Sequence, residues 1–323
     1  MKPLFLQRKE TNMKKFEHVV VVGIDGVGGF IKDADTPNFD KIFENGAVTY
    51  TALSCFPTAS AECWGSMLLG VDPAVHKFNN MMIKESVYPS DSPFPSVFKR
   101  IKKAMPDAEL GSFCNWWPIT SGMIERDLNV ANDSGNDAPL TEKICNYIRE
   151  KAPTFLFIQF DSGDYVGHDT GYGSEAHLKQ IHELDGFLKS IYDATRESNM
   201  ENTLFMVISD HGGTPWDGKT GKPWDGKTAT HGGWSDNEKF VTFAAAGKGV
   251  RKTRLAHMNI RDLSAIILYA FGIDAPDFDA EGWTSQIPLG LFEDDSITEY
   301  RDISDLNGAP PRISRAPHTS EPV

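Results

Sequence analysis

The sequence predicts an α/β fold built on a mainly parallel β-sheet with helices on both faces. Residues 18–24 read His-Val-Val-Val-Val-Gly-Ile, a β-branched run without polar alternation. Such a run is typical of a strand buried on both faces. Segments with helical periodicity alternate with further short apolar runs along most of the chain. This alternation predicts a parallel sheet, because each crossover helix packs back onto the sheet.

The remaining elements are expected in a regular order. A helix is expected at 37–45, since Pro37 suits a first helical turn and Gly46 suits a helix end. A strand follows at 47–53, and a helix at 60–69 stops at Gly70. Further along, we expect helices at 140–151, 174–197 and 259–271 and strands at 154–160, 203–209 and 239–245.

The pattern predicts one catalytic domain over residues 14–292, interrupted by a small cap. The cap is expected at about 71–138, a stretch rich in Pro, Asn, Ser and Asp. Residues 293–323 are acidic and then Pro-rich, which indicates a C-terminal extension. The hexapeptide Pro-Trp-Asp-Gly-Lys-Thr occurs at 215–220 and again at 223–228. It predicts a duplicated surface loop, with a substrate-facing loop as the alternative.

Composition narrows the classes of partner. The 323 residues include 32 Lys and Arg against 45 Asp and Glu, a net charge of −13. This balance argues against binding to a nucleic-acid polymer, which requires a basic surface. It permits a small anionic substrate, because bound metal ions invert the local field. No apolar run approaches the ~20 residues of a membrane span, and no secretory signal is recognised. With four cysteines in no paired spacing, we expect a cytoplasmic protein with reduced thiols.

Polar residues with metal-ligand chemistry follow the expected strands. Asp and His are ligands for zinc or manganese, and the carboxyl ends of parallel strands meet at one edge of a sheet. Any one of these Asp or His residues could simply cap a helix or form a turn. The metal site is inferred because several of them follow different strands in the same chain. The candidate metal ligands are Asp25, Asp164, His168, Asp210, His211 and His231.

These residues stand in motifs that resemble a known family. The motifs are Val22-Gly-Ile-Asp25-Gly26, Asp164-x-x-Gly-His168-x-x-Gly171, Ser209-Asp-His-Gly212, and Thr230-His-Gly232 followed by Asp236-Asn-Glu238. From Val19 to about Gly249 the chain resembles the alkaline phosphatase superfamily, within it the type I phosphodiesterase/nucleotide pyrophosphatase family. The resemblance implies a three-layer α/β sandwich with a mainly parallel central sheet and a small cap. It also implies hydrolysis of phosphoric esters through a covalent intermediate.

Spacing selects Ser60 over Thr58 as the nucleophile that the resemblance implies. The family pattern places the nucleophile ten residues before the Gly that corresponds to Gly70, which gives Ser60. Ser60 also opens the expected helix, whose first-turn N–H groups and dipole favour an anion. Thr58, two residues earlier, is expected to support the turn. The family's phosphate-contacting Asn falls on Cys63, a departure from the pattern.

The resemblance implies two divalent ions, zinc first and manganese as the alternative. Asp25, Asp210 and His211, with Ser60, would hold one ion, and Asp164, His168 and His231 would hold the other. The substrate would be a small phosphorylated molecule; the oligomeric state stays open.

Four other functions remain as alternatives. They are a phosphomonoesterase, a sulfatase, a phosphosugar mutase and a non-catalytic metal-binding module. Cys55-Phe-Pro57-Thr-Ala59 imitates a sulfatase signature but has Ala59 where the signature needs Arg. A mutase carries a large inserted domain, and 71–138 is short for one.

Overall fold

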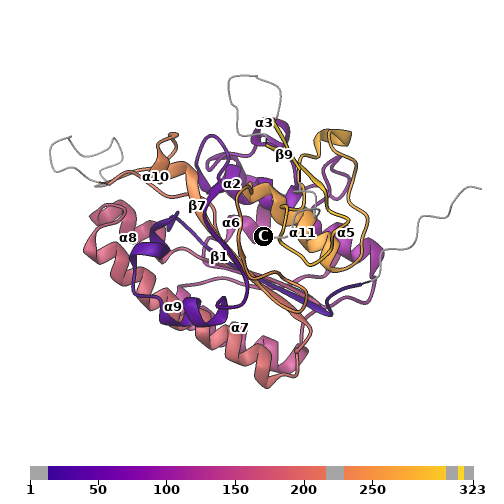
Figure 1. Cartoon of the computed structure of the whole chain (residues 1–323), viewed down its shortest axis with the longest axis horizontal. Helices are drawn as coiled ribbons and strands as arrows, with labels where there is room; N and C mark the ends of the chain where they lie inside the picture. Colours follow the sequence, from indigo (N-terminus) through magenta and orange to yellow (C-terminus); the bar gives the residue numbers. More distant parts are fainter. Residues whose placement is uncertain (1–13, 216–228, 303–311, 316–323) are drawn as a thin grey trace, which may run out of the picture.

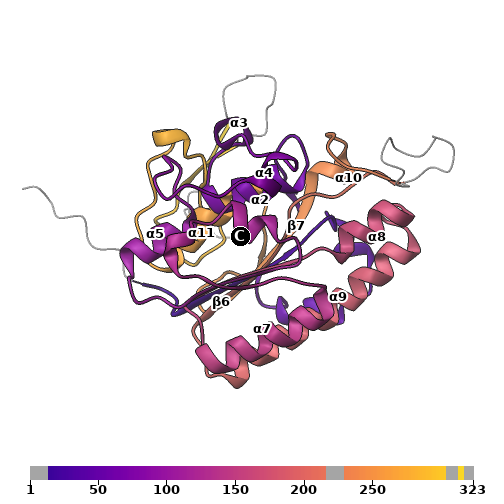
Figure 2. The ribbon, with the colours of Figure 1, turned by 180° about the vertical axis from the view of Figure 1, so that it is seen from behind.

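The computed structural model describes residues 14–215 and 229–302 and the backbone of a strand at 312–315. The duplicated hexapeptide, apart from Pro215, lies outside the described residues. The core of the molecule is an eight-stranded sheet with the order β4-β3-β5-β1-β6-β7-β2-β8, and helices lie on both of its faces (Figures 1 and 2). The predicted three-layer α/β architecture is therefore confirmed.

The sheet is parallel except for one strand. β7 runs antiparallel to both of its neighbours, β6 and β2, and the other adjacent pairs are parallel. The strands are β1 (His18–Ile24), β2 (Ala47–Leu53), β3 (Leu110–Cys114), β4 (Ala131–Asp133), β5 (Phe155–Phe160), β6 (Thr203–Ser209), β7 (Phe240–Ala246) and β8 (Thr253–Arg254). A separate two-stranded sheet pairs β9 (Glu299–Asp302) with β10 (Arg312–Arg315).

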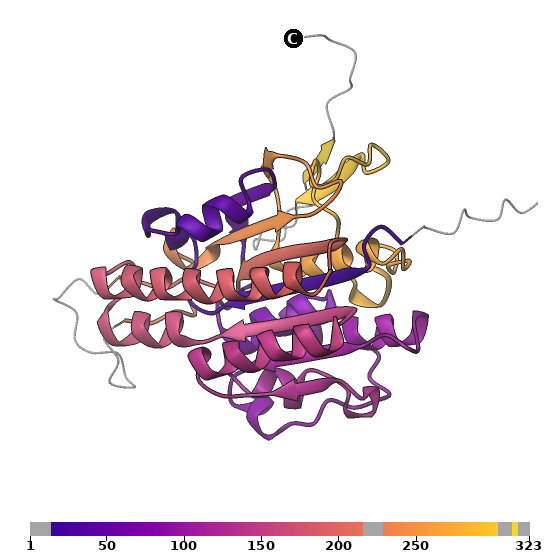
Figure 3. The same ribbon diagram turned by 90° about the horizontal axis from the view of Figure 1, so that it is seen from below.

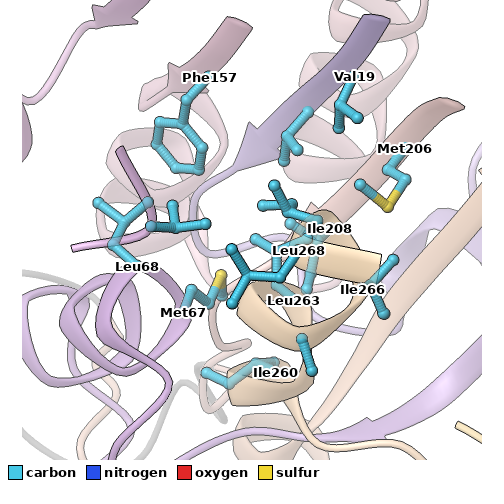
Figure 4. Close-up of a cluster of buried hydrophobic side chains, with 14 of the residues drawn as sticks. Val19, Met67, Leu68, Phe157, Met206, Ile208, Ile260, Leu263, Ile266 and Leu268 are labelled. Carbon is cyan, nitrogen blue, oxygen red and sulfur yellow. The ribbon is translucent and has the colours of Figure 1, made fainter. Parts of the chain in front are cut away.

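One face of the sheet packs against α2 (Ser60–Leu69), α5 (Val97–Ala104) and α11 (Leu263–Ala270). Val19 of β1, Phe157 of β5 and Met206 of β6 point to this face, where they meet Met67 of α2 and Leu263 of α11 (Figure 4). The apolar side chains of these strands alternate between the two faces, as the two-residue period of a strand requires.

The opposite face packs against α1 (Pro37–Ile42), α7 (Asp137–Lys151) and α9 (Glu175–Glu197). Val20 and Val22 of β1 point here and lie in the same core cluster as Ile144 of α7 and Leu184 of α9. Figure 3 views this helical layer and the sheet from below. Because both faces are covered, the central strands can be apolar throughout, which explains the run at 18–24.

Shorter helices lie in the connections. They are α3 (Pro73–His76), α4 (Met82–Glu85), α6 (Pro118–Gly122), α8 (Ser162–Thr170) and α10 (Asp236–Lys239), with 3-10 turns at Phe30–Asp33, Arg126–Leu128, Ile260–Asp262 and Ala280–Gly282.

Most predicted boundaries agree with the structure. The strands at 18–24, 47–53 and 203–209 and the helix at 60–69 have their predicted bounds. α7 begins at Asp137 rather than at residue 140, because Pro139 is tolerated in a first turn whose N–H groups have no helical partner. The segment expected at 259–271 is a 3-10 turn followed by α11.

Residues 71–138 contribute to the central sheet as well as to its covering layer. β3 pairs with β5, and β4 extends the edge beyond β3. These strands were not among the well-marked elements of the sequence, because they are short and stand between loops rich in Pro, Asn and Ser. The division into a catalytic domain at 14–292, a cap and an extension at 293–323 stays a prediction.

Candidate active site

The seven residues selected from the sequence lie together at the carboxyl ends of the central strands. Asp25 follows β1, and Asp210 and His211 follow β6. Asp164 and His168 lie on α8, which begins directly after β5, and Ser60 is the first residue of α2. Open α/β sheets bind their ligands at this edge because the connecting loops diverge there.

Three of these residues surround the ring of a fourth, His211. Its Nε2 lies 3.5 Å from Asp25 Oδ1, 3.2 Å from Asp210 Oδ2 and 3.4 Å from Ser60 Oγ. Asp25, Asp210 and His211 are fully buried, and Ser60 is 8% exposed. We call Asp25, Ser60, Asp210 and His211 the first cluster.

Asp164, His168 and His231 form the second cluster. His168 Nε2 lies 3.3 Å from Asp164 Oδ2, and His231 Nε2 lies 3.8 Å from Asp164 Oδ1. The two clusters are adjacent, since the rings of His211 and His231 stack with centroids 3.8 Å apart. One potential ligand atom from each of Asp25, Asp164 and His211 also lies within 4.8 Å of the others.

Backbone carbonyls orient all three histidines in the same way. Nδ1 donates to the carbonyl of Ala229 in His168 (2.8 Å), of Gly212 in His211 (2.9 Å) and of Thr58 in His231 (2.7 Å). When Nδ1 carries the proton of a neutral imidazole, Nε2 presents its lone pair. Each ring therefore turns an electron pair toward the carboxylates of its cluster, the arrangement found in metal-ligating histidines.

The chemistry of this donor set fits divalent metal ions. Asp25 Oδ1 and Asp210 Oδ2 are buried and accept no hydrogen bond from any described residue. Buried carboxylate oxygens without a donor are costly unless a cation compensates them. The carboxylate oxygens and the histidine lone pairs repel one another, and a cation between them would remove this repulsion. Nitrogen and oxygen ligands of this kind suit zinc.

Carboxylate oxygens in both clusters accept hydrogen bonds from residues that the sequence did not reveal. Asp25 Oδ2 accepts from Trp64 Nε1 (2.9 Å) and from Gln159 Nε2 (3.0 Å). Tyr172 donates its hydroxyl to Asp164 Oδ1 at 2.6 Å. Only Gln159 left a signal, as the single polar residue in the apolar strand β5. Such partners fix the orientation of ligating groups.

Burial and the closeness of the acidic and histidine side chains shift the pKa values of the metal-free site. Burial and the nearby Asp210 and Asp164 carboxylates raise the pKa of Asp25 well above its usual value. Burial also raises the pKa of Asp210 to about 7. Burial and the neighbouring His211 lower the pKa of His231 to about 4. Burial acts to raise the pKa of Asp164 as well, but the neighbouring His231 and His168 outweigh it and hold that pKa below its usual range. Without metal, Asp25 and Asp210 thus favour the protonated acid and His231 the neutral ring, and a bound cation would displace the protons of the two acids.

Ser60 and Thr58 occupy different environments. The Thr58 hydroxyl donates to the Gly233 carbonyl and accepts from the Gly232 N–H, both at 2.9 Å. Both roles of that hydroxyl are therefore used in bracing the loop that carries His231. The Ser60 hydroxyl instead faces the first cluster, 3.4 Å from His211 Nε2.

An amide from a different segment reaches the start of α2. Asn80 Oδ1 accepts from the Ala61 N–H at 2.8 Å, which places Asn80 beside the residue that follows Ser60. Cys63, where the family pattern has Asn, is fully buried and lies against Ser54 Oγ at 3.3 Å. The first turn of α2 thus has the amide of Asn80 beside it, although this sequence has Cys63 at the position where the family pattern has Asn.

Solved structures share this architecture. The murine ectonucleotide pyrophosphatase/phosphodiesterase 5 (ENPP5) matches with a TM-score of 0.66 and 18% identity, over 80% of this chain and 96% of that one. Human ENPP5 gives 0.65 and 16% over the same shares. BT1596, a 2-O GAG sulfatase, gives 0.62 and 13%, over 82% of this chain and 72% of that one. A search of curated protein sequences finds no match.

The chain therefore has an alkaline-phosphatase-like fold, shared with these solved structures. The model of the type I phosphodiesterase/nucleotide pyrophosphatase family matches residues 19–262, and the chain belongs to this family. Family membership makes the protein a hydrolase of phosphoric esters, in a family that depends on metal ions. In the part of the chain that the structure describes, no helix is long and apolar enough to cross a membrane.

Proposed function

We propose that the protein is a two-metal phosphodiesterase of the nucleotide pyrophosphatase type that uses Ser60 as its nucleophile. The observation that carries this proposal is the position of Ser60 Oγ, 3.4 Å from His211 Nε2, at the edge of two adjacent clusters of metal-binding groups. The residue is also the first of α2, so that the helix N-terminus lies beside the hydroxyl.

Each cluster would hold one ion. Asp25, Asp210, His211 and Ser60 would bind the first, and Asp164, His168 and His231 would bind the second, with zinc favoured and manganese as the alternative. When bound, the two ions would make the serine hydroxyl more acidic and compensate negative charge on the phosphoryl group.

The reaction would proceed in two displacements at phosphorus. Ser60 Oγ would form a bond to phosphorus while the bond to the first alcohol breaks; Ser60 would release its proton to solvent, and the departing alkoxide would take one from water. In the second step, a water oxygen would attack phosphorus and the bond to Ser60 Oγ would break, restoring the hydroxyl. The Asn80 Nδ2 group would hold the phosphoryl oxygens together with the first-turn N–H groups of α2 other than that of Ala61, which donates to Asn80 Oδ1.

Nucleoside phosphates are the first substrates to examine. An inactive variant of murine ENPP5 has been solved in complex with AMP. We further propose a cytoplasmic location and a single catalytic domain over residues 14–292. The four cysteines are free and buried, which fits a reducing compartment.

Metal content and turnover together test the proposal. The metal-replete protein should contain two equivalents of metal and hydrolyse bis(p-nitrophenyl) phosphate faster than p-nitrophenyl phosphate, with little action on p-nitrophenyl sulfate. Faster hydrolysis of the monoester would show a phosphomonoesterase. Preference for the sulfate would show a sulfatase, and binding of metal without any turnover would show a binding module.

A further inference from the structure

Glu238 is a buried carboxylate that follows the loop carrying His231. It lies on α10 and is 4% exposed. Its Oε2 accepts from the Ser235 N–H at 3.0 Å and from the Ser235 hydroxyl at 2.6 Å. These contacts belong to a capping box, which by itself serves only the start of α10. The other oxygen of the carboxylate makes a contact outside that box.

This second oxygen holds the loop of His231. Glu238 Oε1 accepts from the Gly233 N–H at 2.7 Å. An added Cβ at Gly233 would come within 2.7 Å of Glu238 Oε2, so the close approach requires glycine there. The Gly233 carbonyl accepts from the Thr58 hydroxyl at 2.9 Å, and the Thr58 carbonyl accepts from His231 Nδ1 at 2.7 Å. The Glu238 side chain therefore supports the hydrogen bonds that orient the His231 ring.

The main chain of Glu238 reaches the loop of the other histidine. Its carbonyl accepts from the Gly212 N–H at 3.0 Å. The Gly212 carbonyl accepts from His211 Nδ1 at 2.9 Å. An added Cβ at Gly212 would lie 2.0 Å from the Asn237 carbonyl oxygen, so the backbone at 237–238 packs directly against Gly212. One residue thus contacts the loops of both histidines, whose rings stack with centroids 3.8 Å apart.

Both sets of contacts lead to the carbonyls that accept from Nδ1. These carbonyls fix the direction of each Nε2 lone pair, and outer partners of this kind typically account for 10–100-fold in metal affinity. His211 belongs to the first cluster and His231 to the second. A residue that holds both loops can therefore affect both clusters, although it is not one of the seven candidate residues.

We propose that Glu238 is a positioning residue that couples the two clusters. Its carboxylate holds the loop of His231 and its carbonyl holds the loop of His211, so a displacement of one loop changes the other. The inference rests on the proposed function, since that function assigns the two histidines to different ions. It adds a physical connection between the two ion sites through the backbone of Glu238.

Glu238→Gln and Ser235→Ala test this connection, with Glu125→Gln as the matched control. Glutamine keeps the size of Glu238 but turns an NH₂ group toward one of the backbone donors. Ser235→Ala removes a single hydroxyl donor. Glu125 is also buried, at 1% exposed, and accepts from the N–H and the hydroxyl of a serine, Ser96, at the start of α5.

Amide hydrogen exchange in the metal-free protein measures the coupling without any ion. In Glu238→Gln, exchange should accelerate about tenfold or more at Gly233 and also at Gly212, whose own acceptor, the Glu238 carbonyl, is still present. Ser235→Ala should produce the same pattern more weakly, and Glu125→Gln should leave both amides at their wild-type rates. Faster exchange at Gly233 alone, or at neither amide, would overturn the coupling. If Glu238→Gln does not fold, Ser235→Ala decides by the same criterion.

Metal titration separates this inference from the proposed function. By competition with a chromogenic chelator, Glu238→Gln should raise the dissociation constants of both ions about tenfold, and Glu125→Gln should raise neither. A purely structural role would lower the unfolding temperature of both variants in EDTA and leave both constants unchanged, which would refute the positioning role. A higher constant for one ion only would overturn the coupling and leave the two-ion hydrolase standing. If wild-type protein binds fewer than two ions, the proposed function is wrong, and the exchange rates at Gly212 and Gly233 decide on the coupling alone.

Discussion

The indole Nε1 of Trp64 donates a hydrogen bond of 2.9 Å to Asp25 Oδ2. The other oxygen of this carboxylate, Oδ1, lies 3.5 Å from His211 Nε2 and accepts no hydrogen bond from any described residue. Trp64 is fully buried, and its ring fills the space beside Gly23, where an added Cβ would come within 2.6 Å of it. The indole is therefore fixed in position, and it fixes which oxygen of Asp25 faces the first cluster.

Replacing Trp64 with Phe should weaken metal binding. Phe keeps part of the apolar packing and removes the donor to Asp25. Loss of an outer partner of a metal ligand typically costs 10–100-fold in affinity, so we expect about a tenfold rise in the metal dissociation constant, measured by competition with a chromogenic chelator. Trp283→Phe is the matched control, because Trp283 is equally buried but packs against Gly70 and Arg100. Equal metal affinity in both variants would refute this role.

Ser60→Ala and Thr58→Ala should differ sharply in their effects. Loss of the nucleophile should lower kcat by about a thousandfold or more, a barrier increase of roughly 4 kcal/mol, while most metal binding persists. Thr58→Ala removes the hydroxyl that braces the 232–233 backbone, so it should lower stability by about 1–3 kcal/mol and affect kcat far less. Peptide mapping of trapped labelled phosphate provides a direct check: label on Thr58 rather than Ser60 would reverse the assignment.

Asn80→Ala should reduce the rate without releasing metal. The side chain lies at the first turn of α2 and, within the described part of the chain, makes no hydrogen bond with any of the seven candidate residues. Removing one donor to a reacting oxyanion typically costs 10²–10³ in kcat, so we expect about a hundredfold loss with p-nitrophenyl substrates. Metal content should stay at the wild-type value. Asn132→Ala is the control, since Asn132 is exposed on the edge strand β4; a loss of metal in Asn80→Ala would instead indicate collapse of the site.

Asp210→Asn should stabilise the metal-free protein as the pH rises. The pKa of Asp210 is raised to about 7 by burial, above the ~3.9 of an unfolded chain. Between these values the folded state holds a proton that the unfolded state has lost, so the contribution of Asp210 to stability is present at low pH and disappears as the pH approaches and passes 7. Asparagine has no such charge to bury.

Thermal unfolding in EDTA provides the measurement. The variant should unfold close to the wild-type temperature at pH 4 and well above it at pH 8, with a difference in unfolding free energy on the order of 4 kcal/mol. With metal added at pH 8 the order should reverse, because the wild-type protein gains binding energy that the variant lacks. A difference that does not change with pH would show that Asp210 stays ionised in the metal-free fold.

The sequence by itself determined the central strands and the candidate metal-binding residues that meet in space. The apolar run at 18–24 predicted a strand covered on both faces, and β1 is such a strand. Gly70 predicted the end of a helix, and α2 ends there. Asp25, Asp164 and His211 stood in local motifs, and because parallel strands end at a common edge, their meeting in space followed from their positions after strands.

Only the tertiary structure decided which residues support that site. Trp64 and Gln159 reach Asp25 across 39 and 134 residues of sequence, and Asn80 reaches Ala61 across 19. The short strands β3 and β4 also gained their place from pairing, β3 with β5 and β4 with β3, rather than from their own residues. No local periodicity records such contacts, because they depend on how side chains of separate elements pack against one another. Hydrophobic periodicity and turn residues are local properties of a chain. The hydrogen-bond partner of a buried polar group depends instead on how distant segments pack in the complete fold.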